Sequence, residues 1–233
     1  MKGNVANYDI WLKARLELLE KEKAYSRLRD ELTRERQALP WVKVEKDYVF
    51  NSEQGEVHLG ELFGDKSQLI VQHFMFEPDW EAGCKSCSYM ADHIDPATVH
   101  LAQRDTAFVA ISIAPISKLS DYKRRMNWQF NWVSSQHSSF NRDFQVSFSD
   151  EERTTQQVTY NYQERTSFPC NEAPGISTFV RDENGDIFHT YSVYGRGLEK
   201  VMTAYDLLDM APKGRDEGGK NMFWLRRKDE YGE

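Results

Sequence analysis

Two buried runs of strand length most constrain the fold of this chain. QLIVQHFMF, residues 68–76, and TAFVAISIA, residues 106–114, are almost continuously apolar, as strands covered on both faces are. Helical sequence separates them, beginning with CSYMADHI, and the helix SKLSDYKRRM follows the second run. Strand, helix, strand, helix at these lengths predicts right-handed crossovers in an α/β protein with a parallel sheet core.

Further elements are expected on both sides of this core. Residues 7–38 form a long helical pattern without Gly or Pro, and a hairpin turning at NSEQG comes next. After the core, a short strand is expected at 131–135, a helix around SFNRDFQV, a second hairpin turning at Asn184 and Gly185, and a last helix over 198–210. We therefore divide the chain into a helical extension (1–40), one domain (41–212) with a polar insertion (149–174), and a tail (213–233).

Composition excludes several classes of function. The formal net charge of −7 argues against general binding to nucleic acids or anionic membranes, which requires a basic surface. The sequence has no apolar run of 18 residues and no signal-peptide pattern at its start, so we expect a cytoplasmic protein. Three cysteines are too few for a disulfide scaffold, so a close pair is interpreted as catalytic or metal-binding.

The segment WEAGCKSCSYMA, residues 80–91, contains the close pair Cys84 and Cys87 at the expected start of a helix. Unpaired backbone N–H groups and the helix dipole favour thiolate there, and CxxC motifs lower a cysteine pKa from about 8.5 to roughly 3.5–7.5. Cys84 is thus the expected nucleophile, with Lys85 adding positive charge. Cys87, nearly one turn on, is placed to attack a mixed disulfide on Cys84. Such a cycle needs no bound cofactor or metal, only an external thiol reductant or an oxidant.

Other interpretations of the pair stay open. Both thiols can be small apolar core residues packed against Tyr89 and Met90. They also have the spacing of half a zinc site, which His93, His100, Cys170 or His189 could complete. Cys170 itself is either idle or a third redox thiol. His73 is expected to be a core histidine, or else a group beneath the dithiol that relays the proton of the resolving thiol.

The order hairpin, strand, CxxC, helix, strand, helix and terminal strand–strand–helix resembles a thioredoxin-like fold with a peroxiredoxin-like elaboration, a mixed central sheet flanked by helices. Specific stretches, LIVQHFMFEPDWEAGCKSCSYMADHID, YKRRMNWQFNWVSS, FNRDF, IFHTYSVYGRGL and WLRRKDEY, are similar to domain-of-unknown-function family 899, thioredoxin-like proteins labelled as predicted dithiol–disulfide oxidoreductases. Thioredoxins place a cis-proline before the strand that faces the dithiol. Pro174 lies two or three residues before that place, so Ile176 or Ser177 is expected there.

The resemblance implies a thiol–disulfide oxidoreductase that uses Cys84 and Cys87. Supporting or substrate-binding roles are expected for Trp80, Gly83, Lys85 and Ser86, which surround the pair in sequence. A thiol peroxidase, or a non-catalytic binding protein with a structural zinc, are the alternatives. Expected partners are a disulfide-containing protein or a small thiol compound, an external thiol reductant, and a second copy of the chain bound through the long helix, with no nucleic acid and no membrane.

Overall fold

The computed structural model describes residues 3–165 and 168–232, and the chain divides into two compact units, Met1–Pro40 and Trp41–Glu233. The first unit is dominated by the helix α1 (Tyr8–Gln37), which confirms the expected long N-terminal helix. Asn7 caps it, because its side-chain oxygen accepts a hydrogen bond from the backbone N–H of Ile10 at 3.0 Å.

Eight strands of the described second unit form one mixed sheet in the order β1-β10-β9-β4-β5-β6-β2-β3. The parallel pairs are β4 with β5 and β5 with β6, and β9 runs antiparallel to β4. The strands are β1 (Val42–Lys43), β2 (Val49–Ser52), β3 (Gly55–His58), β4 (Gln68–His73), β5 (Thr106–Ser112), β6 (Asn131–Ser134), β9 (Gly175–Arg181) and β10 (Ile187–Tyr194); β7 (Val158–Tyr160) and β8 (Gln163–Arg165) form a separate hairpin.

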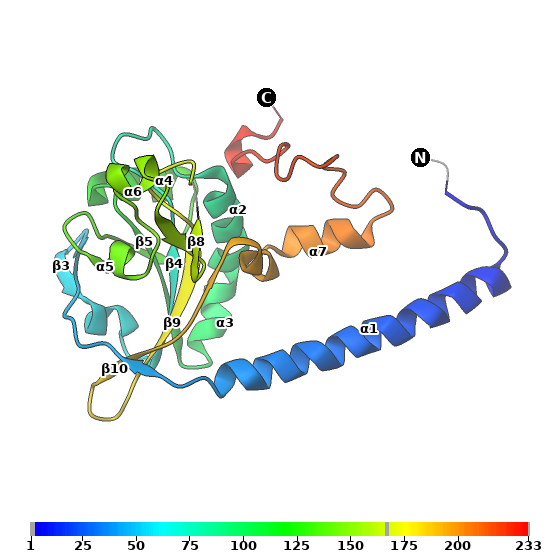
Figure 1. The fold of residues 1–233 in the computed structure, drawn as a ribbon, viewed down its shortest axis with the longest axis horizontal. Coiled ribbons are helices and arrows are strands. Elements are labelled where there is room, and N and C mark those ends of the chain that lie inside the picture. The colour runs from blue at the N-terminus through cyan, green and yellow to red at the C-terminus, as the bar shows by residue number, and fades with distance from the viewer. Residues whose placement is uncertain (1–2, 166–167, 233) are drawn as a thin grey trace. The chain divides into compact units, whose positions relative to one another are not determined.

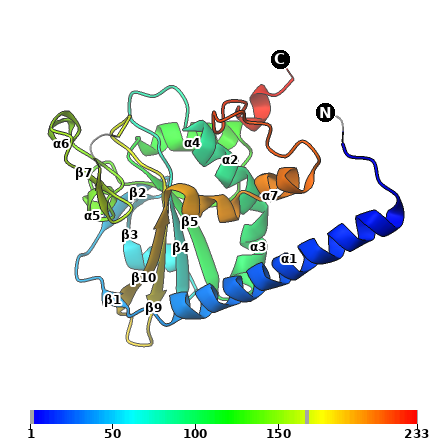
Figure 2. The same ribbon diagram turned by 45° about the vertical axis from the view of Figure 1, so that its right-hand side comes forward.

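Helices cover both faces of this sheet (Figures 1 and 2). One face carries the larger apolar cluster, in which Phe74, Met90, Leu119 and Tyr205 are buried. The other face is covered by a short 3-10 helix and by Phe140. The helices are α2 (Lys85–Ile94), α3 (Thr98–Ala102), α4 (Ile116–Arg125), α5 (Phe140–Asp143), α6 (Asp150–Thr154) and α7 (Thr203–Met210), with 3-10 helices η1 (Leu59–Phe63), η2 (Asp95–Ala97), η3 (Gly195–Val201) and η4 (Lys228–Glu230).

The expected strand–helix–strand core is confirmed: β4 leads into α2, and β5 returns parallel to β4. The expected first hairpin is also present as β2 and β3. Residues 42–43, however, pair with β10 at the far edge of the sheet. The predicted single helix over 198–210 is wrong, because η3 and α7 are separated at Met202, whose backbone (φ −106°, ψ 69°) is not helical.

The described part of the 149–174 insertion is ordered by aromatic side chains. Tyr160 packs against Phe168 and Tyr194, with ring centroids 5.1 and 5.5 Å apart, and the Tyr160 hydroxyl donates a hydrogen bond to the carbonyl of Pro174 at 2.7 Å. Residues 166–167 of the insertion lie outside the described part. The insertion is thereby anchored next to the start of β9.

Candidate active site at the start of α2

Cys84 is the residue that caps the N-terminus of α2, as the sequence predicts. Its backbone N–H donates to the carbonyl of Met75 at 3.1 Å, which ties the start of the helix to the segment that follows β4. Its carbonyl accepts hydrogen bonds from the N–H of Ser88 at 2.9 Å and from the Ser88 hydroxyl at 2.8 Å. The backbone around the Cys84 sulfur is therefore fixed by both the sheet and the helix.

Hydrogen-bond donors surround the Cys84 sulfur. The thiol of Cys87, the hydroxyl of Ser86 with Oγ 3.1 Å from Sγ, and the backbone N–H groups of both residues lower the pKa of Cys84 to about 6, although partial burial opposes them. These are the donors that the first turn of a helix leaves unpaired. Cys84 is half-buried as a residue, and its lowered pKa favours the thiolate at neutral pH.

The pKa of Cys87 is shifted in the opposite direction to that of Cys84. It is fully buried, and burial together with its hydrogen bond to Cys84 raises its pKa well above the ordinary value. The amide of Gln72, on β4 beneath the helix, donates to the Cys87 carbonyl at 3.1 Å. Neither cysteine is disulfide-bonded, and the opposite pKa shifts favour a thiolate at Cys84 and a protonated thiol at Cys87.

Gly83 and Trp80 position the loop before Cys84. A Cβ atom on Gly83 would lie 2.7 Å from Cε1 of Phe74 and 2.8 Å from Cε1 of Tyr122, so only glycine fits between these two core rings. The carbonyl of Trp80 accepts a hydrogen bond from Lys118 at 2.6 Å, and the ring of Trp80 packs against the larger apolar cluster. The side chain of Lys85 is exposed, and its electrostatic contribution stays a prediction.

Pro174 lines the pocket beside the dithiol, although the sequence places it two or three residues before the expected position. It directly precedes β9 and lines the same pocket as Cys87, whereas Ile176 and Ser177 are inside β9, opposite Gln72 and Val71 of β4. The peptide bond before Pro174 is trans. β9 begins at Gly175, the first residue of the pattern GISTFV, so Pro174 is the last residue before the strand.

His73 does not lie beneath the dithiol. Its ring stacks on Phe140 and Phe144 on the opposite face of the sheet, and burial lowers its pKa to about 3. Successive residues of a strand point to opposite faces, so Gln72, not His73, faces α2. The proton-relay role proposed for His73 is therefore wrong.

Three of the four candidate zinc ligands make hydrogen bonds elsewhere, and the fourth, His100, is exposed on α3. The ring nitrogens of His93 contact the carbonyl of Tyr89 at 2.6 Å and the N–H of Ala204 at 3.1 Å, and His189 contacts the Ser192 hydroxyl at 2.7 Å. Cys170 donates to the carbonyl of Glu172 at 3.2 Å. Within residues 3–165 and 168–232, no three His, Cys, Asp or Glu side chains cluster in a way that could hold a metal ion.

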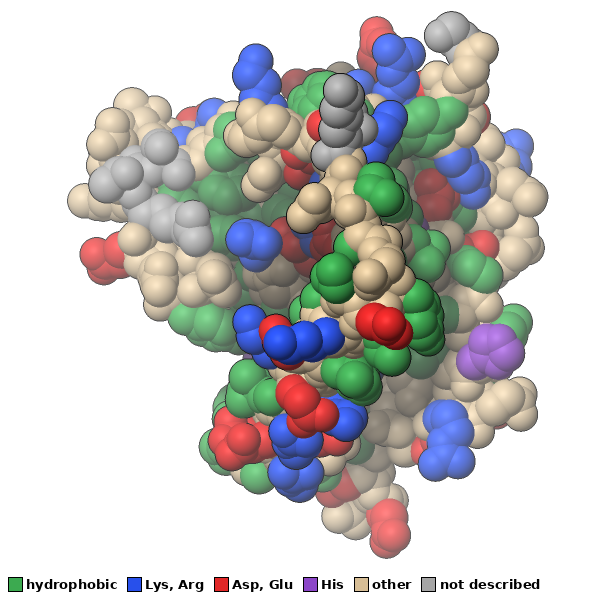
Figure 3. Space-filling model, turned by 90° about the vertical axis from the view of Figure 1, so that its right-hand side faces the viewer, with side chains coloured by type: hydrophobic (Ala, Val, Ile, Leu, Met, Phe, Trp, Pro, Cys, Tyr) green, Lys and Arg blue, Asp and Glu red, His purple; other side chains and the backbone are tan. Residues whose placement is uncertain are grey.

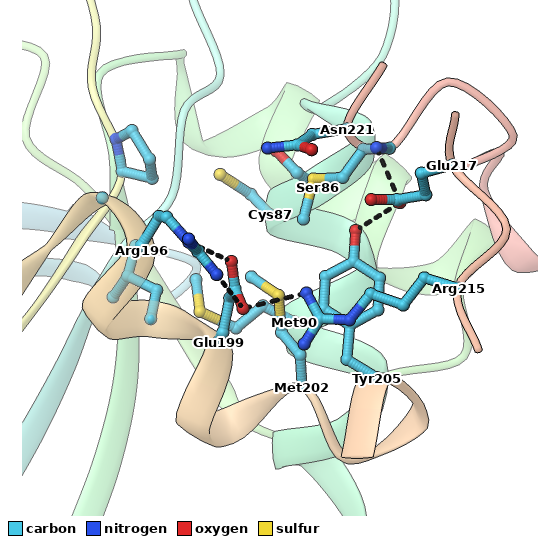
Figure 4. A pocket seen from close by; sticks show the side chains of 14 residues that line it. Ser86, Cys87, Met90, Arg196, Glu199, Met202, Tyr205, Arg215, Glu217 and Asn221 are labelled. Carbon is cyan, nitrogen blue, oxygen red and sulfur yellow. Dashed lines mark hydrogen bonds and ion pairs between the residues drawn. The ribbon is translucent and has the colours of Figure 1, made fainter. Parts of the chain in front are cut away.

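A pocket of about 270 Å³ opens beside Ser86 and Cys87 (Figure 4). Three of its charged groups form ion pairs, since Glu199 accepts from Arg196 at 3.0 Å and from Arg215 at 2.9 Å, and the carboxylate of Glu217 accepts from the hydroxyl of Tyr205 at 3.0 Å. The remaining wall is mainly apolar and is formed by Met90, Pro174, Leu198, Met202 and Met222. The pocket therefore offers an adaptable, methionine-rich wall next to the CxxC segment.

Sequence reasoning missed Gln72, Ser88, Tyr122 and Arg227 as parts of this site. Ser88 and Tyr122 connect α2 to α4 through a 2.9 Å contact between their hydroxyl groups. Arg227 comes from the tail and donates to the carbonyl of Gly83. A polar Gln72 within a buried strand was the available sequence signal, whereas nothing in the sequence placed the tail beside residue 83.

The sheet order, with a dithiol between the first central strand and its helix, defines a thioredoxin-like protein. The model of a family described as bacterial proteins of unknown function (DUF899) matches residues 1–231, and the chain belongs to that family. No curated protein sequence matches the chain.

Several solved structures are similar to the chain. A peroxidoxin, BcpB, from Mycobacterium tuberculosis aligns with a TM-score of 0.45 and 13% identity over 71% of this chain and 96% of that one. DsbE of Chlorobium tepidum, described as a thiol:disulfide interchange protein, aligns with a TM-score of 0.43 and 13% identity over 72% and 98%. Peroxiredoxin Q of Xanthomonas campestris aligns with a TM-score of 0.45 and 10% identity over 72% and 94%.

Proposed function

We propose that this protein is a thiol–disulfide oxidoreductase in which Cys84 is the nucleophile and Cys87 the resolving thiol. The observation that carries the proposal is the placement of the two sulfurs at the start of α2: donors from Cys87 and Ser86 lower the pKa of Cys84 to about 6, and burial raises that of Cys87. A dithiol reductant needs one thiolate that attacks the substrate disulfide and one protonated thiol that later attacks the mixed disulfide.

The reaction follows from this arrangement. The Cys84 thiolate attacks one sulfur of a substrate disulfide, forming a mixed disulfide and releasing the other sulfur as a thiolate. Cys87 then gives its proton to that leaving thiolate and attacks Cys84, which forms the Cys84–Cys87 disulfide and releases the second substrate sulfur. An external thiol reductant supplies the two electrons that restore the dithiol.

The substrate is a disulfide in a protein or in a small thiol compound. The pocket beside Cys87 supports this choice, because its paired charges and methionine side chains favour apolar groups next to the disulfide. We propose that the segment around the dithiol holds or contacts the substrate through Trp80, Gly83, Lys85 and Ser86.

Mass mapping after mild oxidation tests the proposal. Trypsin cuts after Lys85 and therefore places Cys84, Cys87 and Cys170 on three different peptides. We expect a disulfide between the Cys84 and Cys87 peptides and reduction of insulin by the wild-type protein with dithiothreitol, both lost in Cys84→Ser and kept in Cys170→Ser. A Cys84–Cys170 link, or equal insulin reduction by Cys84→Ser, would contradict the proposal.

Peroxide consumption is the second arm of the same test, because an ionised Cys84 is also the requirement for a thiol peroxidase. We expect dithiothreitol-dependent consumption of hydrogen peroxide to be no faster in the wild-type protein than in Cys84→Ser. Rapid consumption by the wild-type protein alone would replace the oxidoreductase with a peroxidase that uses the same sulfur.

Domain division, assembly and location remain part of the proposal. Residues 41–212 are proposed to carry the chemistry, 149–174 to be an insertion, and 1–40 to join two copies into a homodimer. Within α1, the exposed apolar residues are Tyr8, Ile10, Trp11, Leu16, Leu18, Tyr25, Leu28 and Leu32.

A cytoplasmic location is proposed because free thiols persist in a reducing compartment. No helix in the described part of the chain is long and apolar enough to span a bilayer.

A further inference from the structure

We propose that Arg227, from the C-terminal tail, is a positioning residue that keeps Cys84 at the N-terminus of α2. This inference rests on the proposed function of the dithiol. It concerns a residue outside the CxxC segment and 143 positions after Cys84 in sequence.

Arg227 fixes the peptide bond that enters the nucleophile. Its guanidinium group donates two hydrogen bonds to the carbonyl of Gly83, from Nε at 3.1 Å and from Nη2 at 2.8 Å. The N–H of the same peptide unit belongs to Cys84 and donates to the carbonyl of Met75 at 3.1 Å. Both ends of the Gly83–Cys84 peptide are therefore held, one by the tail and one by the segment that follows β4.

The loop needs this restraint because residue 83 is glycine. Phe74 and Tyr122 occupy the space of a side chain, so the loop cannot use a conformationally stiffer residue there. Gly83 is also buried, and its carbonyl would lose its charged donor without the guanidinium group. Rotation of this peptide would change the backbone of Cys84 and move its sulfur away from the donors on Ser86 and Cys87.

The position of Arg227 is itself determined by neighbouring contacts. Its Nη1 lies 2.8 Å from Glu230, which also accepts from Arg125 of α4 at 3.1 Å. Lys228 pairs with Asp92 of α2 at 3.0 Å. Leu225 is buried in the larger apolar cluster, so the tail is packed onto the helices that frame the dithiol.

The geometry predicts that losing the guanidinium group raises the pKa of Cys84, because the sulfur moves away from the donors on Ser86 and Cys87. The test compares Arg227→Met, Arg227→Lys and the wild-type protein by thiolate absorbance at 240 nm between pH 4.5 and 9. The control Arg226→Met removes the same charge from an exposed neighbour. Thermal unfolding monitored by circular dichroism shows whether each variant is folded.

We expect Arg227→Met and Arg227→Lys both to titrate at higher pH than the wild-type protein, with Arg226→Met unchanged. A rise of one pKa unit corresponds to about threefold less thiolate at pH 6.5. Lysine keeps the charge but cannot donate two hydrogen bonds in the forked geometry of arginine.

An unchanged pKa in Arg227→Met would overturn the inference, and so would a rise that Arg227→Lys fully reverses, because charge alone would then act. If Arg227→Met does not fold, the test rests on the folded Arg227→Lys variant. A Cys84 pKa equal to that of the wild-type protein in Arg227→Lys then overturns the inference. If the wild-type protein itself shows no thiolate titrating near pH 6, the proposed function fails instead, and the two failures are thereby distinguished.

Discussion

The packing around position 83 determines that this residue is glycine. Alanine would place a methyl group 2.7 Å from the ring of Phe74 and 2.8 Å from that of Tyr122. We expect Gly83→Ala to lower the free energy of unfolding by about 1–3 kcal/mol, since overpacking a buried site forces its neighbours to move. Urea unfolding measures the loss, and Gly3→Ala, where nothing lies within 4 Å, is the matched control. Equal stability of the two variants would contradict the packing seen here.

Glu172 is a buried carboxyl whose pKa is raised to about 8, chiefly by burial, although Ser147 and Asn141 hydrogen-bond to it. Below about pH 4.5 it is protonated in both folded and unfolded chains. As the pH rises towards 8, the unfolded chain ionises first, so this group destabilises the fold by up to about 1.4 kcal/mol per pH unit.

Glu172→Gln should therefore gain stability relative to the wild-type protein as the pH increases from 5 to 8.5. Urea unfolding at these two pH values measures the gain, and Glu164→Gln, at an exposed carboxyl, should show no comparable change. A pH-independent difference between Glu172→Gln and the wild-type protein would show that the carboxyl is already ionised in the fold.

At the scale of elements, α2 and α4 are joined by the hydroxyl groups of Ser88 and Tyr122, 2.9 Å apart. Ser88→Ala removes this contact and the 2.8 Å hydrogen bond to the Cys84 carbonyl, and it leaves the Tyr122 hydroxyl buried without that partner. We expect a loss of about 1–3 kcal/mol in the free energy of unfolding.

Tyr122→Phe is the matched variant, because it removes the contact between the hydroxyl groups but keeps the bond to Cys84. We expect it to cost less than Ser88→Ala in urea unfolding, and the double variant to cost less than the two losses added together. Strict additivity would mean that the two hydroxyl groups do not interact.

The elements that sequence reasoning predicted correctly share one property: their patterns are local. Buried runs such as 68–76 and 106–114 specify strands by themselves, and the long helix and both hairpins follow from periodicity and turn residues. The break at Met202 and the pairing of residues 42–43 with β10 depend on tertiary packing, which no local pattern records.

In the candidate site, too, the residues that depend on local sequence could be predicted and those that depend on long-range contacts could not. Cys84 and Cys87 were evident from spacing, because the chemistry depends on neighbours in one helical turn. Gln72 reaches Cys87 across the sheet-to-helix packing, and Arg227 reaches Gly83 from the end of the chain. Contacts of this kind require knowing which segments meet in space.

At the scale of the whole molecule, hydrophobic side chains occur at the surface among Lys, Arg, Asp and Glu (Figure 3). Those of α1 support the proposed homodimer. We expect light scattering after size exclusion to give twice the mass of one 27.3 kDa chain, and Trp11→Glu with Leu18→Glu to shift it towards one chain. The exposed polar pair Lys13→Glu with Arg27→Glu should leave the dimer intact, and a wild-type monomer would refute the assembly.

The central claim is that Cys84 is an ionised sulfur at neutral pH while Cys87 stays protonated. Competitive alkylation of the full-length protein between pH 4.5 and 9.5, with each cysteine quantified on its own tryptic peptide, measures this most directly. The account predicts half-maximal reactivity of Cys84 near pH 6 and little reaction at Cys87 below pH 9. Reactivity of Cys84 that rises only near pH 8.5, or equal reactivity of the two cysteines, would contradict it.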